Sequence, residues 1–189
     1  MKGKVIIVSA PSGCGKSTII NRIMDRGNVA LNFSVSATNR PPRPGETDGV
    51  SYHFITTEQF LDAIARNEFV EYEEVYPGRF YGTLKSEIAS RCEKGETVLL
   101  DIDVKGGVRV KELYGEDALS IFIMPPSVPE LRRRLEGRGT DSPEAIDQRV
   151  NKAEFELSYA PSYDCCVVND DLNAAVDQTE HLISKFLQK

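Results

Sequence analysis

The sequence predicts an α/β fold in which a parallel sheet has helices on both faces. Lys4–Ser9 (KVIIVS) is a continuous apolar run, as expected for a central strand that is covered on both sides. Lys16–Arg26 carries its isoleucines at helical spacing and is followed by Gly27, a helix stop signal. Further short apolar runs alternate with helical patterns along the chain, and this alternation favours a doubly wound parallel sheet.

Three later apolar runs predict the remaining strands of this sheet. They are Thr97–Ile102, Leu119–Met124 and Cys165–Val168. The last run is followed by a helical pattern over Leu172–Leu187.

Two stretches interrupt the alternation of strands and helices. From about Phe33 to Tyr81 the chain has short alternating segments around a turn-rich RPPRPGETDG, which predicts a small mixed β insertion. One helix is expected there at Thr57–Arg66, capped by Thr56 or Thr57. From Ser127 to Tyr159 the pattern is helical, and its two runs meet at GRGTDSP, where Ser142 can cap a helix that starts with Pro143. We therefore expect three parts: a core of residues 1–32, 84–126 and 160–189, an insertion of 33–83, and a helical lid of 127–159.

Composition narrows the class of protein. The 189 residues are 40% hydrophobic and 28% charged, which is typical of a globular domain. With a net charge of −6, the surface as a whole is not suited to nucleic acid or an anionic membrane, so neither is expected as a partner. No apolar run approaches the roughly 20 residues of a membrane span, and the N-terminus resembles a first strand and not a signal peptide, so a cytoplasmic location is expected. The four cysteines lack CxxC or zinc-finger spacing, and Cys165 and Cys166 are expected to be buried free thiols.

The segment APSGCGKS, between the first strand and the first helix, has the pattern and the context of a Walker A loop. Gly13 and Gly15 allow the backbone N–H groups to approach phosphates, Lys16 is placed to reach the β and γ phosphates of ATP, and Ser17 can supply a hydroxyl ligand to Mg²⁺. Ala10 stands where the pattern has its first glycine, which would matter only if that position required a positive φ. The expected ATP-binding residues of the loop are Ala10, Pro11, Ser12, Gly13, Cys14, Gly15, Lys16, Ser17 and Thr18.

The run LLDID offers a second acidic element of such a site. An apolar strand that ends in Asp is typical of a Walker B position, which would place Asp101 near Mg²⁺ and its waters. Whether Asp101 or Asp103 lies closer to the metal is left open by the sequence.

A series of motifs then identifies a family. SAPSGCGKST, SVSATNRPPRPGE, FVEYEEV, FYGT, LLDIDVKGG, LEGRGTDS and VVNDDL occur in this order, and together they resemble guanylate kinase over nearly the whole chain. The resemblance implies the reaction ATP + GMP ⇌ ADP + GDP with Mg²⁺, on a core with a GMP-binding domain and a lid. Composition and spacing by themselves predict only a P-loop kinase with two insertions.

The resemblance also assigns the acceptor site residue by residue. It implies that the phosphate of GMP is bound by Ser36, Arg40, Arg43, Tyr52 and Tyr81. Two guanidinium groups three residues apart have the chemistry to clamp one phosphate dianion. The guanine base is assigned to Glu71, Thr83 and Asp103: a carboxylate accepts from N1–H and the 2-amino group, and a hydroxyl can donate to O6.

Three arginines of the lid are implied to be catalytic, together with Lys16: Arg134, Arg138 and Arg149. Positioned cations are the main catalytic device where a phosphoryl group is transferred without a covalent nucleophile. Arg134 and Arg138 would share one face if their helix is continuous. Asn169 matches the family's contact on the adenine side.

Two alternatives stay open. A P-loop kinase of the same build could act on another phosphorylated acceptor, such as a ribose phosphate, but it would have no use for the base-reading trio Glu71, Thr83 and Asp103. A catalytically dead module that binds protein partners is disfavoured by the intact Lys16, Ser17 and lid arginines. Use of dGMP and the oligomeric state are not determined by the sequence.

Overall fold

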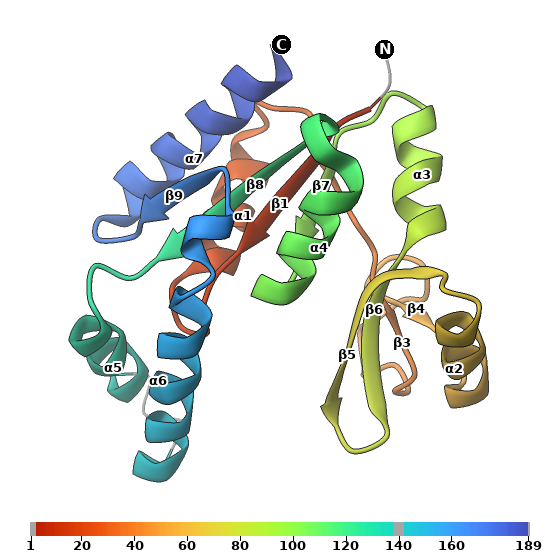
Figure 1. Ribbon diagram of the computed structural model, residues 1–189, viewed down its shortest axis with the longest axis horizontal. Coiled ribbons are helices and arrows are strands. Elements are labelled where there is room, and N and C mark those ends of the chain that lie inside the picture. Colours follow the sequence, from red (N-terminus) through yellow and green to blue (C-terminus); the bar gives the residue numbers. More distant parts are fainter. Residues whose placement is uncertain (1–2, 138–141, 189) are drawn as a thin grey trace. The chain divides into compact units, whose positions relative to one another are not determined.

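The computed structural model describes residues 3–137 and 142–188 and confirms the α/β class (Figure 1). Its strands are β1 (Val5–Ser9), β2 (Asn32–Phe33), β3 (Ala37–Thr38), β4 (His53–Phe54), β5 (Phe69–Tyr76), β6 (Arg79–Leu84), β7 (Val98–Asp101), β8 (Ala118–Met124) and β9 (Cys165–Val168). Its α-helices are α1 (Lys16–Arg26), α2 (Thr57–Ala65), α3 (Lys85–Glu93), α4 (Val104–Tyr114), α5 (Val128–Glu136), α6 (Pro143–Leu157) and α7 (Leu172–Leu187). Two short 3₁₀ helices follow α4 and α6, at Gly115–Asp117 and Ala160–Ser162.

The larger sheet has the strand order β2-β7-β1-β8-β9. Every residue of β1 is buried, which agrees with its uninterrupted apolar sequence. The register is parallel at both edges, with Asn32 opposite Val98 and Ile121 opposite Cys165. Since the carboxyl ends of parallel strands meet at one edge, the loops after β1 and β7 are placed to build a common site.

By its internal contacts the chain divides into two compact units. Unit 1 comprises Met1–Val5 and Asn32–Leu100, and unit 2 comprises Ile6–Leu31 and Asp101–Lys189. The three-part division expected from the sequence stays a prediction.

Unit 1 contains the mixed β insertion. Its four-stranded sheet has the order β4-β3-β6-β5, with β5 and β6 forming an antiparallel hairpin. Helix α2 packs through Phe60, whose ring stacks on that of Phe69 with 4.4 Å between the ring centres, in a core with Ala37 and Ala63. Thr56 caps this helix in a reciprocal capping box with Gln59, as the sequence predicts.

Unit 2 contains the two helices of the stretch 127–159 that the sequence predicts as a lid. Helices α5 and α6 lie side by side (Figure 1) and bury Leu131, Leu135, Ile146 and Val150. The α6 helix begins at Pro143 with Ser142 as its N-cap, which confirms the expected start. Most of the expected junction between the two helices, residues 138–141, lies outside the described residues.

The expectation for the cysteine pair is partly wrong. The four cysteines are free thiols, and Cys14 and Cys92 are buried, but Cys165 is half-buried and Cys166 is exposed. The reason is topological: β9 is the edge strand of the sheet, so its successive side chains alternate between a covered face and an open one.

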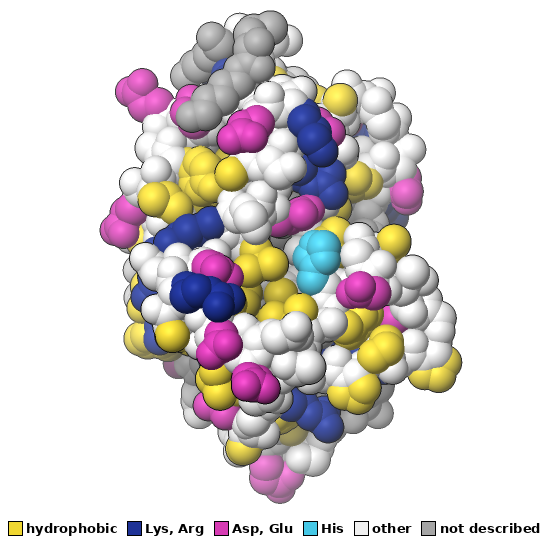
Figure 2. Space-filling model, turned by 90° about the vertical axis from the view of Figure 1, so that its right-hand side faces the viewer, with side chains coloured by type: hydrophobic (Ala, Val, Ile, Leu, Met, Phe, Trp, Pro, Cys, Tyr) yellow, Lys and Arg dark blue, Asp and Glu magenta, His cyan; other side chains and the backbone are white. Residues whose placement is uncertain are grey.

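The molecular surface carries both signs of charge. On the face shown in Figure 2, acidic and basic side chains are interspersed, and neither sign covers a broad area. Within residues 3–137 and 142–188, we find no helix with the length and apolarity needed to cross a membrane.

Candidate active site

The loop between β1 and α1 has the geometry of an anion-binding site, and it is called the phosphate loop below. Helix α1 begins at Lys16, no side chain caps its N-terminus, and no acidic residue occupies its first turn. Its first backbone N–H groups are therefore available to an anion. The loop lines a cavity of about 420 Å³, within the usual range for ligand sites. The cavity is lined by Ala10, Pro11, Ser12, Gly13, Cys14, Gly15, Lys16, Ser17, Thr18, Asp101, Ile102, Asp103 and Glu156.

Both loop glycines are required by backbone geometry and by packing. Gly13 has φ +91° and Gly15 has φ +85°, a region that favours glycine. A β carbon at Gly13 would approach the Leu135 side chain of α5 to 2.9 Å. Among the described residues only Asn67 combines a side chain with positive φ, so Ala10 fits its position without strain.

Asn169 lies against the phosphate loop. Its amide Nδ2 donates to the carbonyl of Cys14 at 2.8 Å, and a β carbon at Gly15 would collide with the same nitrogen. Asn169 is buried, and its own N–H donates to Met124 at the end of β8. The structure thus places this residue at the loop and gives it a structural contact that the sequence did not predict.

Lys16 and Asp101 meet inside the cavity. The Lys16 ammonium lies 2.5 Å from the Asp101 carboxylate and also donates to the carbonyl of Ile102 at 3.2 Å. Asp103 instead caps helix α4, its Oδ1 accepting from the N–H groups of Lys105 and Gly106. Both aspartates line the cavity, and of the two only Asp101 forms an ion pair with Lys16.

The donor set suits a metal that is bound mainly by phosphates and water. Among the described residues no three His, Cys, Asp or Glu side chains form a self-contained metal site. Ser17 and Asp101 both line the cavity and offer oxygen ligands, which Mg²⁺ prefers.

Glu156 of α6 is a cavity residue that the sequence did not single out. It is only 8% exposed, and its Oε2 has no hydrogen-bond partner among the described residues. Burial raises the pKa of this carboxyl. Burial and the Glu156 charge also raise the pKa of the Cys14 thiol, to about 12, so Cys14 stays neutral at physiological pH. No local sequence signal marks Glu156, because its place depends on how α6 packs.

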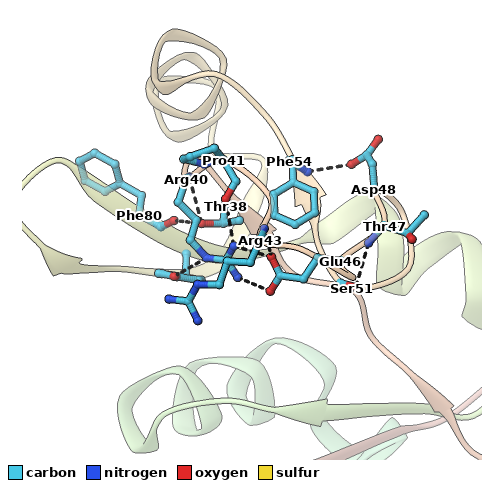
Figure 3. A network of polar contacts seen from close by, with 11 residues as sticks. Thr38, Arg40, Pro41, Arg43, Glu46, Thr47, Asp48, Ser51, Phe54 and Phe80 are labelled. Atoms are coloured by element: carbon cyan, nitrogen blue, oxygen red, sulfur yellow. Dashed lines mark hydrogen bonds and ion pairs between the residues drawn. The ribbon is translucent and has the colours of Figure 1, made fainter.

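All five residues implied to bind the acceptor phosphate belong to unit 1, and Figure 3 shows two of them, Arg40 and Arg43. The Arg40 guanidinium is buried, donates from Nε to the Tyr81 hydroxyl at 3.0 Å, and lies 5.0 Å from the centre of the Tyr52 ring. Arg43 has an exposed side chain in the adjoining loop. Ser36 immediately precedes β3, and its carbonyl accepts from the N–H of His53.

A residue that was missed, Glu46, belongs to the same cluster. Its carboxylate accepts from both terminal nitrogens of Arg40, each at 2.6 Å, and from the Arg43 backbone N–H at 2.7 Å. The Arg40 guanidinium lowers the pKa of Glu46 to about 2. The signal was present in the sequence as a Pro-Gly turn that leads from Arg43 to Glu46.

Two of the three residues implied to read guanine form a buried pair. Glu71 and Thr83 lie opposite each other on β5 and β6, and the Thr83 hydroxyl donates to Glu71 Oε1 at 2.6 Å. Glu71 is 8% exposed and Thr83 is fully buried. In this arrangement the hydroxyl proton of Thr83 is used within the protein. The third residue, Asp103, belongs to the other unit.

The lid arginines are only partly described. Arg134 forms an ion pair with Glu130 at 2.8 Å and donates to the carbonyl of Asn169 at 2.8 Å, which links α5 to the residue beside the phosphate loop. Arg149 is a half-buried residue of α6. Arg138 lies outside the described residues.

Comparison with known proteins agrees with this geometry. A family model described as Guanylate kinase matches residues 2–186. A protein named Guanylate kinase from Bacteroides thetaiotaomicron is 56% identical over 189 residues, which are 100% of this chain and 92% of that protein. A second, from Salinibacter ruber, is 51% identical over 183 residues, 97% of this chain and 96% of that one.

A solved structure supports the same assignment. The crystal structure of guanylate kinase from Anaplasma phagocytophilum aligns with a TM-score of 0.75 at 33% identity, covering 100% of this chain and 88% of that one. The chain therefore belongs to the guanylate kinase family, whose members use ATP to phosphorylate GMP.

Proposed function

We propose that this chain transfers the γ-phosphoryl group of ATP to GMP through a donor site in unit 2 and an acceptor site in unit 1. The observation that carries the proposal lies on strand β6. Tyr81 and Thr83 are two residues apart, so their side chains project from the same face, roughly 7 Å apart along the strand. One joins the arginine cluster and the other joins Glu71. A phosphate site and a base-reading pair on one strand face suit a nucleoside monophosphate.

In the acceptor site, the base is proposed to be read by Glu71. Its carboxylate can accept from N1–H and the 2-amino group of guanine, a donor pattern that adenine does not present. The Thr83 hydroxyl orients this carboxylate by donating to it. Asp103 is proposed as a further contact to the base, since its Oδ1 accepts from the backbone and its second carboxylate oxygen can accept from the 2-amino group. The phosphate is assigned to Ser36, Arg40, Arg43, Tyr52 and Tyr81.

In the donor site, the phosphates of ATP are proposed to lie against the backbone N–H groups of residues 10–18. Lys16 would leave Asp101 to reach the β and γ phosphates. Ser17 directly and Asp101 through water would hold Mg²⁺, which when bound neutralises charge on the phosphate oxygens. Asn169 is proposed to face the adenine side of ATP while supporting the loop from Cys14.

The lid arginines are proposed to stabilise the transferring phosphoryl group. Arg134, Arg138 and Arg149 carry charge that matches the equatorial oxygens of that group. Glu130 holds the guanidinium of Arg134 against α5, so this arginine is oriented before any substrate binds. Such pre-orientation lowers the cost of forming the transition-state contact.

A coupled assay of ADP release tests the proposal, with GMP, dGMP, AMP, CMP, UMP and ribose 5-phosphate as acceptors. We expect turnover with GMP and dGMP, because no residue of the proposed site is assigned to the 2′-hydroxyl. A site built to pair a specific donor pattern rejects a base without it by about 10⁴-fold, so little turnover is expected with AMP. Preference for the sugar phosphate would support a different kinase, and no turnover with any acceptor would support a binding module.

The setting of this reaction follows from its substrates. We propose that the chain acts in the cytoplasm, where ATP and GMP are available, and contributes to the recycling of purine nucleotides and the supply of GTP. Small nucleotides are the only partners that this proposal requires.

A further inference from the structure

We infer that Glu46 is a positioning residue of the acceptor site. It holds the Arg40 side chain in place and compensates its charge, and it leaves Arg43 as the arginine that clamps the phosphate. The inference deepens the proposed function and rests on it, since it takes the arginine cluster of unit 1 as the phosphate site. Three features point to this role: the hydrogen bonds of Arg40, the turn that carries Glu46, and the exposed side chain of Arg43 (Figure 3).

The donors of Arg40 are largely consumed within the protein. A guanidinium has five N–H bonds. Nε donates to the Tyr81 hydroxyl, Nη1 to the Pro41 carbonyl and to Glu46, and Nη2 to the second oxygen of Glu46. These contacts account for four of the five, and they leave one N–H on Nη2 for a ligand. Arg40 cannot make a bidentate contact with a phosphate while Glu46 holds it.

The position of Arg40 is also fixed by packing. Its side chain is 5% exposed, and its guanidinium carbon lies 5.0 Å from the Tyr52 ring centre and 5.5 Å from that of Phe54. A charge this deeply enclosed needs a partner, because removing the partner leaves it uncompensated. Glu46 supplies that partner with two charge-assisted hydrogen bonds.

A tight turn in the local sequence places the Glu46 carboxylate next to both arginines. The Glu46 N–H donates to the Arg43 carbonyl at 3.0 Å, with Pro44 and Gly45 between them and φ +87° at Gly45. Proline followed by a positive-φ glycine is the signature of a type II turn. The turn brings the Glu46 carboxylate back onto the Arg43 backbone N–H at 2.7 Å, so the same carboxylate orients both arginines.

Arg43 differs from Arg40 in what its side chain contacts. The Arg43 side chain is exposed, and its structurally defined contact to Glu46 is through the backbone. Its guanidinium therefore retains the freedom and the donors to meet a phosphate dianion in the planar fork that arginine offers. Glu46 thus gives the two arginines different roles. Arg40, with its charge compensated, shapes the floor of the site and offers one N–H, and Arg43 binds the phosphate with its guanidinium.

The test compares Glu46→Gln with a matched control, Glu68→Gln. Glu68 pairs with Arg66 on an exposed part of the same unit, so the control removes a carboxylate–arginine pair outside the site. We expect Glu46→Gln to raise the KM for GMP about 10- to 100-fold, as loss of a hydrogen bond to a charged group implies, with the KM for ATP unchanged. Glu68→Gln is expected to alter neither constant.

A binding measurement separates positioning from a loss of folding. Calorimetry with GMP and with guanosine, which has no phosphate, should show the loss for GMP alone, because the base-reading pair is untouched. Glu46→Asp keeps a carboxylate one methylene shorter, and we expect it to restore part of the GMP affinity. Equal losses for GMP and guanosine, or no rescue by Asp, would show a merely structural role and overturn the inference.

Three other outcomes are distinguishable. If Glu46→Gln lowers the KM for GMP, the carboxylate competes with the phosphate and does not position its ligands, which contradicts the inference. If Arg43→Ala and Arg40→Ala both leave the KM for GMP unchanged, the proposed acceptor site itself is wrong. If Arg43→Ala raises that KM while Glu46→Gln does not, the inference fails and the proposed function stands.

Discussion

At the scale of single residues, we expect the hydrogen bond from Thr83 to Glu71 to affect how the proposed acceptor site binds GMP. Thr83→Val keeps the shape of the side chain but removes the donor at 2.6 Å from the buried carboxylate. We expect the KM for GMP to rise about tenfold or more, since a lost hydrogen bond to a charged group costs roughly 1.5–3 kcal/mol. The KM for ATP should not change.

Thr83→Ser is the matched control, because it restores the hydroxyl. Steady-state kinetics with each nucleotide varied in turn would measure both constants. If the Val variant binds GMP as well as the Ser variant does, the hydroxyl does not decide affinity for GMP and the prediction is wrong.

Glu156 is a residue whose charge opposes folding. Its Oε2 is buried without a partner among the described residues, and burial raises the pKa of the carboxyl above its usual value of 4.5. A raised folded-state pKa means that ionisation above pH 4.5 costs stability, and that protonation at lower pH removes this cost. We expect Glu156→Gln to raise the Tm at pH 8 by about 1–4 °C and to have little effect at pH 4.

Thermal unfolding at the two pH values measures this difference. Glu154→Gln serves as the control, because Glu154 is exposed on the same helix. A Tm that falls at pH 8 in the Glu156 variant would show that the ion pair of Glu156 with Lys152, at 3.7 Å, outweighs the cost of burying the charge.

At the scale of elements, the phosphate loop is held by contacts that come from distant parts of unit 2. Gly15→Ala would bring a β carbon into collision with Asn169 Nδ2 and would also strain the backbone at φ +85°. Backbone strain alone costs about 1–2 kcal/mol. We expect the free energy of unfolding of this variant to fall by more than that, and we expect it to bind ATP more weakly.

Gly27→Ala isolates the cost of the backbone, because Gly27 has φ +64° and a β carbon added there would meet nothing within 4 Å. Urea unfolding of both variants without nucleotide measures the difference. Equal losses of stability would show that Asn169 moves aside freely and does not support the loop.

At the scale of the whole molecule, we expect two ion-paired glutamates to shape the acid limb of the stability profile. Arginine partners lower the pKa of Glu46 and of Glu130 to about 2 each. A lowered pKa means that the stabilisation is complete above the unfolded value of about 4.5 and is lost as pH falls toward 2. We therefore expect the Tm to fall between about pH 5 and pH 2.5, with a flatter profile in Glu130→Gln.

Glu136→Gln is the control for this prediction, since Glu136 is on the same helix and lies 3.9 Å from Arg132. Differential scanning calorimetry across this pH range gives the profiles. An identical acid limb in wild type and Glu130→Gln would exclude the Glu130 ion pairs as its cause.

The local sequence determined much of this protein. The apolar run of β1, the glycines and lysine that follow it, the Thr56 capping box and the Ser142–Pro143 helix start are encoded by neighbours within a few residues. Periodicity and capping act over such short distances, so these elements could be predicted with near-correct bounds. The resemblance carried by the motifs added the acceptor residues, and the structure brings Arg40, Tyr52 and Tyr81 into one cluster.

Only the tertiary structure decided how distant residues meet. Asn169 lies 155 residues along the chain from Cys14, to whose carbonyl it donates. Glu156 lines the cavity of the phosphate loop only because helix α6 packs next to that loop. Cys166 is exposed because β9 is an edge strand, which an apolar sequence does not reveal. Such contacts depend on the strand order and on how the helices pack. Strand order and helix packing follow from how the whole chain buries its apolar surface, whereas a local pattern shows only which face of an element is apolar.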